Sequence, residues 1–168
     1  MFQAFARIIR AADDKFLVLD TAPTGHSVLL LDATGAYHRE VIRQMDRTAT
    51  RSITPMMQLQ DPKRTQVLIV TRAETTPVLA ATRLQADLRR AGIEPWAWII
   101  NGSLAAAAPE APLLRQQAAG ELREINRIAH RHAARYAVLP WLRDEPLGTQ
   151  SLRALMGPAP MRSSALTA

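Results

Sequence analysis

The stretch from Gln66 to Ile100, QVLIVTRAETTPVLAATRLQADLRRAGIEPWAWII, decides the fold of this chain. It begins and ends with a short apolar run, QVLIV and WAWII, which is typical of strands buried on both faces. Between the two runs, Thr75–Ala91 carries apolar residues at helical spacing, with a threonine cap and Pro77 at its start and Gly92 after its end. The order strand, helix, strand predicts a parallel βαβ unit with a right-handed crossover.

Similar patterns on either side of this unit extend the sheet. Phe16–Leu19 (FLVL) and Tyr136–Pro140 (YAVLP) are short apolar runs and predict two more strands. Leu113–Arg135 alternates apolar and charged residues at helical spacing, and Ser151–Met156 begins a last helix. Ser103–Pro112 has the composition of a loop. We therefore predict an α/β fold in which a parallel sheet of four strands carries helices on both faces.

Length and composition limit the class of protein. The 168 residues fit one domain, and 48% hydrophobic with 21% charged residues is typical of a globular chain, with a tail from about residue 157 expected to be disordered. Cysteine is absent, which excludes a disulfide framework, a thiolate metal site and a cysteine nucleophile. No apolar run approaches the ~20 residues of a membrane span, and Arg7 and Arg10 interrupt the N-terminal apolar stretch, so no signal-peptide core is present. These features predict a cytoplasmic protein.

The formal net charge of +6 comes mostly from arginine, because Lys15 and Lys63 are the only lysines. A basic balance can indicate binding to nucleic acid or to an anionic membrane, but solvated helix faces explain it without a ligand. The arginines are spread along the chain without a dense run, and no RNP, zinc-finger or helix-turn-helix signature is present. We therefore expect no nucleic-acid partner.

Polar or turn residues follow each of the predicted strands. In a parallel sheet the carboxyl ends of the strands meet at one edge, and ligands bind there. We therefore expect a site at this edge, built from the residues that end the four strands: Asp20, Thr71 to Glu74, Asn101 and Pro140.

The residues after the first apolar run add detail to this site. A strand-end aspartate such as Asp20 can hold a water on Mg²⁺, or it can merely cap the next turn. The turn that follows contains Thr24, Gly25 and His26, and such a turn could respond to the presence or loss of a γ-phosphate. Taken alone, His26 also fits a helix start or a packing position.

The segment DTAPTGHSVLLLDATGAYHRE, from Asp20 to Glu40, resembles the DTAPTGHT signature of the arsenical pump-driving ATPase (ArsA) family. These are deviant-Walker nucleoside triphosphatases. The resemblance continues through Ile53–Asn101 to PLLRQQAAGELREI and YAVLPWL, and it is greatest to the C-terminal portion of the second nucleotide-binding half. It implies that residues 1–168 form one partial ATPase domain, a P-loop NTPase fold without the phosphate-loop strand.

The resemblance also implies roles for individual residues. Asp20 is similar to the switch II aspartate that reaches the water shell of Mg²⁺. Thr24, Gly25 and His26 resemble the relay that couples the nucleotide state to the metalloid site. Three residues at strand ends resemble those that hold the ribose and adenine of ATP: Glu74, Asn101 and Pro140. For Pro140, simple termination of a strand is an equally good explanation.

This chain departs from the family pattern in several respects, one of which is Gly102 in place of an asparagine. No G-x-x-x-x-G-K-[ST] loop is present to cradle the β- and γ-phosphates, and no cysteines are present to bind a metalloid. The expectation is a C-terminal part of an arsenite-translocating ATPase that uses ATP and Mg²⁺ in the complete enzyme and is catalytically incomplete alone.

The implied partners are the N-terminal ATPase portion or a full-length ATPase, and an arsenite efflux permease at the inner membrane. Two alternatives remain at this point. One is a non-catalytic interaction module that docks on a full-length ATPase or on the permease. The other is a nucleotide- or nucleic-acid-binding domain that uses its basic surface.

Overall fold

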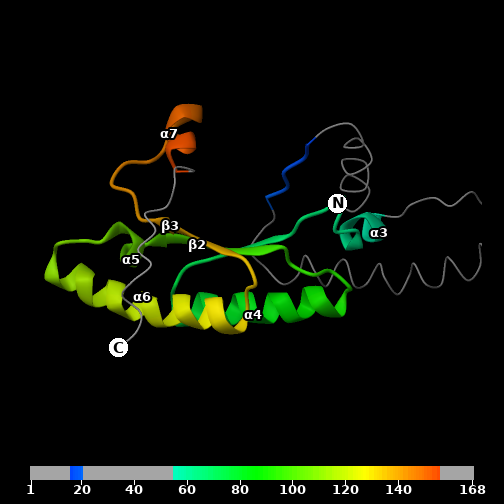
Figure 1. Cartoon of the computed structure of the whole chain (residues 1–168), viewed down its shortest axis with the longest axis horizontal. Coiled ribbons are helices and arrows are strands. Elements are labelled where there is room, and N and C mark those ends of the chain that lie inside the picture. Colours follow the sequence, from blue (N-terminus) through cyan, green and yellow to red (C-terminus); the bar gives the residue numbers. More distant parts are fainter. Residues whose placement is uncertain (1–15, 21–54, 156–168) are drawn as a thin grey trace, which may run out of the picture.

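The computed structural model describes residues 16–20 and 55–155 (Figure 1). Its centre is a three-stranded parallel sheet in the order β1–β2–β3. The strands are β1 (Leu68–Thr71), β2 (Ala97–Ser103) and β3 (Tyr136–Pro140). The described helices, in chain order, are α3 (Pro55–Gln60), α4 (Thr75–Arg90), α5 (Leu104–Ala107), α6 (Pro112–Arg131) and α7 (Gly148–Ala154).

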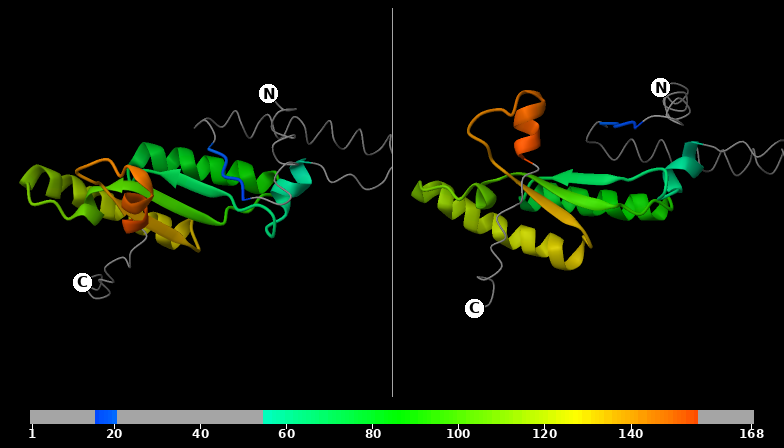
Figure 2. Two further views of the ribbon diagram at one scale, coloured as in Figure 1. Left: turned by 90° about the horizontal axis from the view of Figure 1, so that it is seen from above. Right: turned by 45° about the horizontal axis from the view of Figure 1, so that its top comes forward.

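The predicted parallel α/β arrangement is confirmed for this part of the chain. Helix α4 connects β1 to β2, and α5 with α6 connects β2 to β3. The two long helices, α4 and α6, lie on the same face of the sheet, whereas the short α7 lies on the opposite side (Figures 1 and 2). The helices of the described part are therefore divided unequally between the two faces. None of them combines the length and apolar character needed to cross a bilayer.

The prediction of a strand at Phe16–Leu19 is wrong. These residues lie outside every strand of the described sheet, and all four side chains are exposed, that of Phe16 to 98%. The right-hand view of Figure 2 shows this segment set apart from the sheet, on the side opposite α4 and α6. An apolar run has the composition of a buried strand, but its ladder partners and its cover must come from other elements. The first strand of the described sheet is therefore β1.

Helix α4 shows how local sequence fixes an element. It begins at Thr75 after Glu74, whose side chain makes no capping bond, so the predicted threonine cap is wrong. The helix ends at Arg90, and the predicted stop, Gly92, follows the C-cap Ala91 with a φ of +76°, in the left-handed region that glycine tolerates. The N–H of Gly92 donates to the carbonyl of Arg89, and the N–H of Ile93 donates to that of Leu88. This pair of bonds closes the helix in a Schellman motif.

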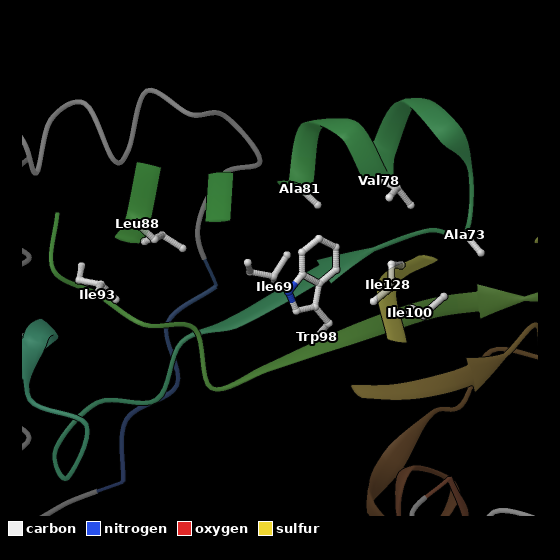
Figure 3. Packing of buried hydrophobic residues seen from close by; sticks show 9 residues of the cluster. All are labelled: Ile69, Ala73, Val78, Ala81, Leu88, Ile93, Trp98, Ile100 and Ile128. Carbon is white, nitrogen blue, oxygen red and sulfur yellow. The ribbon is translucent and has the colours of Figure 1, made fainter. Parts of the chain in front are cut away.

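The core lies between the sheet and the two long helices. Trp98 of β2 is 1% exposed, and Figure 3 shows its indole between the sheet and α4. Its register partner on β1, Ile69, points to the same face because paired residues of parallel strands do so. The core consists of nine buried residues: Ile69, Ala73, Val78, Ala81, Leu88, Ile93, Trp98, Ile100 and Ile128.

On the other face of the described sheet, apolar side chains of β1 are exposed. Leu68 and Val70 of β1 alternate with the buried Ile69 and are 47% and 61% exposed. Ile99 of β2 pairs with Val70 and is half-buried. We call these three residues the open sheet face. An exposed apolar surface next to an edge strand favours contact with another chain.

Lowering the pH is expected to destabilise the fold through His132, whose imidazole stacks on Trp98 with 5.8 Å between ring centroids. Burial lowers the pKa of this imidazole below its ordinary 6.5, and the positive charges of three residues lower it further: Arg127, Arg131 and Arg89. The folded state therefore binds this proton less tightly than the unfolded chain does. The stabilisation is fully present above pH 6.5 and is lost as the pH falls through the lowered folded-state pKa. Thermal melting should show a midpoint that falls by a few degrees between about pH 8 and about pH 5.

A matched pair of variants tests this assignment. His132→Gln removes the titrating group and should flatten the pH dependence of the melting temperature. His130→Gln changes an exposed histidine in the last turn of α6, two residues before His132, and should leave that dependence as it is in the wild type. Equal pH dependence in the wild type and in His132→Gln would contradict the assignment.

Candidate functional site

The carboxyl ends of β2 and β3 border a groove of about 460 Å³. This volume lies within the range of small-molecule sites, about 300–1,000 Å³. The groove is lined by the ends of β2 and β3, by the segment that follows β3, and by Leu155, which directly follows α7 (Figure 1). Asn101 and Pro140, which were predicted to share a site, both line this groove. Its lining also includes Gly102, Trp141, Arg143 and Asp144.

An irregularity in β2 shapes the floor of the groove. Ile100 pairs with Val138 and Ser103 pairs with Pro140, so three steps along β2 oppose two along β3. Such a bulge bends the strand and redirects the side chains beside it. Gly102, within the bulge, has a φ of +66°, where other residues are strained.

Trp141 covers this bulge. A Cβ atom at Gly102 would lie 3.6 Å from Cε3 of the indole, which shows how closely the ring approaches the backbone. The N–H of Trp141 donates to the carbonyl oxygen of Ser103 at 2.9 Å. The ring is nevertheless 52% exposed, so part of it remains available to a ligand in the groove.

Arg72 connects Glu74 to this aromatic ring. The guanidinium lies 5.6 Å from the centroid of the Trp141 ring, and its Nε is 2.9 Å from Oε1 of Glu74. Both charged side chains are half-exposed, so the ion pair contributes little to stability, and its effect is to orient the groups. Glu74 therefore does not line the groove itself. It contacts Arg72, and Arg72 contacts the Trp141 ring, which does line the groove.

The groove has the chemistry of a site for a planar heterocycle. The exposed carboxamide of Asn101 can donate and accept hydrogen bonds at the edge of a base. The ring of Trp141 offers a face for stacking, and Arg72 beside it holds that ring by a cation–π contact. Within the part of the chain that the structure describes, no three acidic or histidine side chains are grouped so that they could hold a metal ion.

Asp20, the predicted switch II aspartate, does not line the groove. Asp20 ends the exposed segment after Leu19, outside the sheet, and so does not occupy the strand end expected for it. Thr24, Gly25 and His26 lie outside the described residues, as does the tail from about residue 157. The roles assigned to these residues stay predictions.

Sequence reasoning missed several residues of the groove. Trp141 received no role, although it directly follows a predicted strand-end proline. Arg72 was expected at the site only as a member of the range Thr71 to Glu74, and its contact with the Trp141 ring was not predicted. Gly102 was noted only as a departure from the family pattern, yet a glycine between two polar residues at a strand end is a signal for a bulge. This signal could have been found in the sequence.

Comparison with known proteins identifies close relatives. Residues 29–158 match the sequence pattern of a family described as anion-transporting ATPase. An arsenical pump-driving ATPase of Acidiphilium multivorum is 58% identical over 156 residues, which is 93% of this chain and 27% of the relative. An arsenical pump-driving ATPase of Escherichia coli is 57% identical over 94% of this chain and 27% of its own length. The chain thus spans about a quarter of these relatives.

Proposed function

Because the chain belongs to the anion-transporting ATPase family, we propose that it is the C-terminal part of an arsenite-translocating ATPase. The complete enzyme would couple ATP hydrolysis to the efflux of arsenite or antimonite through a membrane permease. The chain would supply the groove for the adenine, and the phosphate-binding loop would come from another part of the ATPase. The observation that carries the proposal is the meeting of Asn101, Pro140 and Trp141 in one groove at the carboxyl ends of the strands.

The groove residues fit the base and ribose of ATP. The exposed ring of Trp141 suits base stacking, which is worth about 1–3 kcal/mol per base in proteins that bind single-stranded nucleic acid. Asn101 would pair with the edge of the adenine, and Pro140 would border its face. Glu74, behind Arg72, would lie on the ribose side. These residues would bind and orient the base and ribose of ATP, and they would not contact the γ-phosphate that reacts.

The remaining predicted residues would connect the nucleotide to the pump. Asp20 would hold Mg²⁺ through a water, which suits an ion that keeps much of its hydration and needs only one or two protein carboxylates. Thr24, Gly25 and His26 would relay the nucleotide state to the metalloid site. The partners would be the N-terminal ATPase portion or a full-length ATPase, and the efflux permease. Through the permease, the protein would work at the cytoplasmic side of the inner membrane.

Adenosine is the probe that tests the groove, because the nucleoside needs no phosphate loop. Titration of the chain with adenosine, followed by NMR, should shift the Asn101 side-chain amide in a saturable way. Asn101→Ala should weaken adenosine binding about tenfold, as the loss of a hydrogen-bonded pair predicts. Asn126→Ala, which changes an asparagine of α6, should not alter the affinity. Absence of saturable shifts in the wild type, or equal affinity in Asn101→Ala, would contradict the proposal.

A second candidate is a non-catalytic module that docks on a full-length ATPase or on the permease. The exposure of Leu68 and Val70 on the open sheet face favours it. A pull-down with a full-length relative separates the two functions. If the chain is a docking module, it should bind the full-length relative, Val70→Lys should abolish this binding, and Asn101→Ala should leave it intact. If the chain is part of an ATPase, it should also bind adenosine.

A further inference from the structure

One carboxylate lies where the core would ordinarily hold an apolar side chain. Glu121, on the sheet-facing side of α6, is only 9% exposed. Its Oε2 atom accepts two hydrogen bonds, from the Oγ–H of Ser103 at 2.7 Å and from the N–H of Ala105 at 3.0 Å. Burial of a charged group is unfavourable unless hydrogen bonds compensate for the lost water. The two donors provide this compensation, and in return the carboxylate fixes their positions.

Ser103 carries this constraint from α6 to the groove. It is 1% exposed and ends β2, where it lies opposite Pro140. Its Oγ accepts a bond from the N–H of Ala106 at 3.2 Å, and its carbonyl oxygen accepts the N–H of Trp141 at 2.9 Å. One residue thus connects Glu121 on the core side with Trp141 on the groove side. Because the bulge ends at Ser103, the same anchor fixes the chain that carries Asn101.

We propose that Glu121 is a positioning residue for the groove. Through Ser103 it holds the bulge in the one conformation that places the Asn101 carboxamide and the Trp141 ring in the same groove. An apolar residue at position 121 would fill the space without the unfavourable burial of charge, but it would leave the Ser103 hydroxyl and the Ala105 N–H without their acceptor. The nature of the ligand, an adenine base, rests on the proposed function. The anchoring of Trp141 does not depend on it.

A role limited to capping the short helix α5 is the alternative. In that case, loss of Glu121 would loosen Ala105 and Ala106 but leave the Trp141 N–H and the groove unchanged. Positioning predicts instead that the effect passes through Ser103 to Trp141. The two explanations therefore differ in the hydrogen exchange that they predict for one backbone amide, that of Trp141.

Amide hydrogen exchange of the whole chain, followed by NMR, measures this difference without a ligand. Glu121→Ala should speed exchange at Trp141 about tenfold, and Ser103→Ala, which removes the same hydrogen bond from its other end, should speed exchange at Trp141 as well as at Ala106. Glu121→Gln keeps an oxygen acceptor and should restore slow exchange. The control is Gln85→Ala, because Gln85 is likewise a buried polar residue of a helix with a hydrogen bond to the backbone, which it donates to the carbonyl of His132 at 2.8 Å. It should leave Trp141 unaffected.

Adenosine titration of the same variants gives the second measurement. Glu121→Ala should weaken binding about tenfold, Glu121→Gln should bind nearly as the wild type, and Gln85→Ala should bind as the wild type. The proposal is overturned if Trp141 exchanges no faster in Glu121→Ala than in Gln85→Ala, or if these two variants bind adenosine equally well. If the wild type binds no adenosine, the proposed function fails, and exchange at Trp141 alone decides the role of Glu121.

Discussion

A polypeptide of these 168 residues is expected to show no ATP turnover above that of a heat-denatured sample. Enzymes catalyse phosphoryl transfer chiefly by positioning the phosphates and neutralising their charge. The sequence contains no G-x-x-x-x-G-K-[ST] loop, and the candidate groove holds groups suited to a base, not to a triphosphate. The chain should therefore bind the nucleoside end of ATP without cleaving it. A coupled assay for released phosphate measures this directly.

The missing ATPase activity should be restored when the phosphate loop is supplied by a second polypeptide. Co-expression with the upstream portion of a related ATPase, which carries the phosphate loop, should restore ATP hydrolysis. Asp20→Ala should abolish the restored activity, whereas Asp87→Ala, which removes a carboxylate paired with Arg90 on α4, should not. Turnover by the chain alone that Asp20→Ala abolishes would show that the phosphate-binding groups are present after all.

Self-association of the isolated chain is the second large effect. Two of the three residues of the open sheet face belong to β1, which is an edge strand of the described sheet. Hydrophobic edge strands recruit further chains unless charge or cover protects them. Size-exclusion chromatography should show species larger than the 18.6 kDa monomer. Val70→Lys places a charge on this face and should raise the concentration at which the chain associates by at least about tenfold. Leu79→Lys, at an exposed position of α4, is the matched control and should change little.

A monomeric wild-type chain would contradict the prediction of self-association. A wild-type chain that runs as a single monomeric species, and unfolds cooperatively at high temperature, would show that the apolar side chains of β1 do not drive association. In the described sheet the unprotected apolar strand is β1. The prediction therefore rests on Leu68 and Val70.

The central βαβ unit could be predicted because its signals are local. The apolar runs of β1 and β2, Pro77 in the first turn of α4 and Gly92 after its end act through neighbouring residues. The strand at Phe16–Leu19 could not be judged in this way. Its composition shows that burial would be favourable, but pairing depends on elements distant in the sequence.

The candidate site could also be predicted only in part. Asn101 and Pro140 meet because the ends of parallel strands meet, which follows from topology. The contact of Arg72 with Trp141 arises only from tertiary packing. Glu121 lies on a helix with many charged neighbours, so its sequence context indicates a solvated face, and only the fold reveals its bond to Ser103.

The strand order of the sheet has a consequence for synthesis on the ribosome. Each strand pairs with the strand that precedes it in the chain, so the spatial order β1–β2–β3 is also the temporal order. As β2 emerges, β1 and α4 are already available to receive it, and the same holds for β3 after α6. When β2 and β3 are made, each already has one pairing partner, although parallel pairing across a connecting helix is itself a slow step. This sheet can grow at one edge while translation continues.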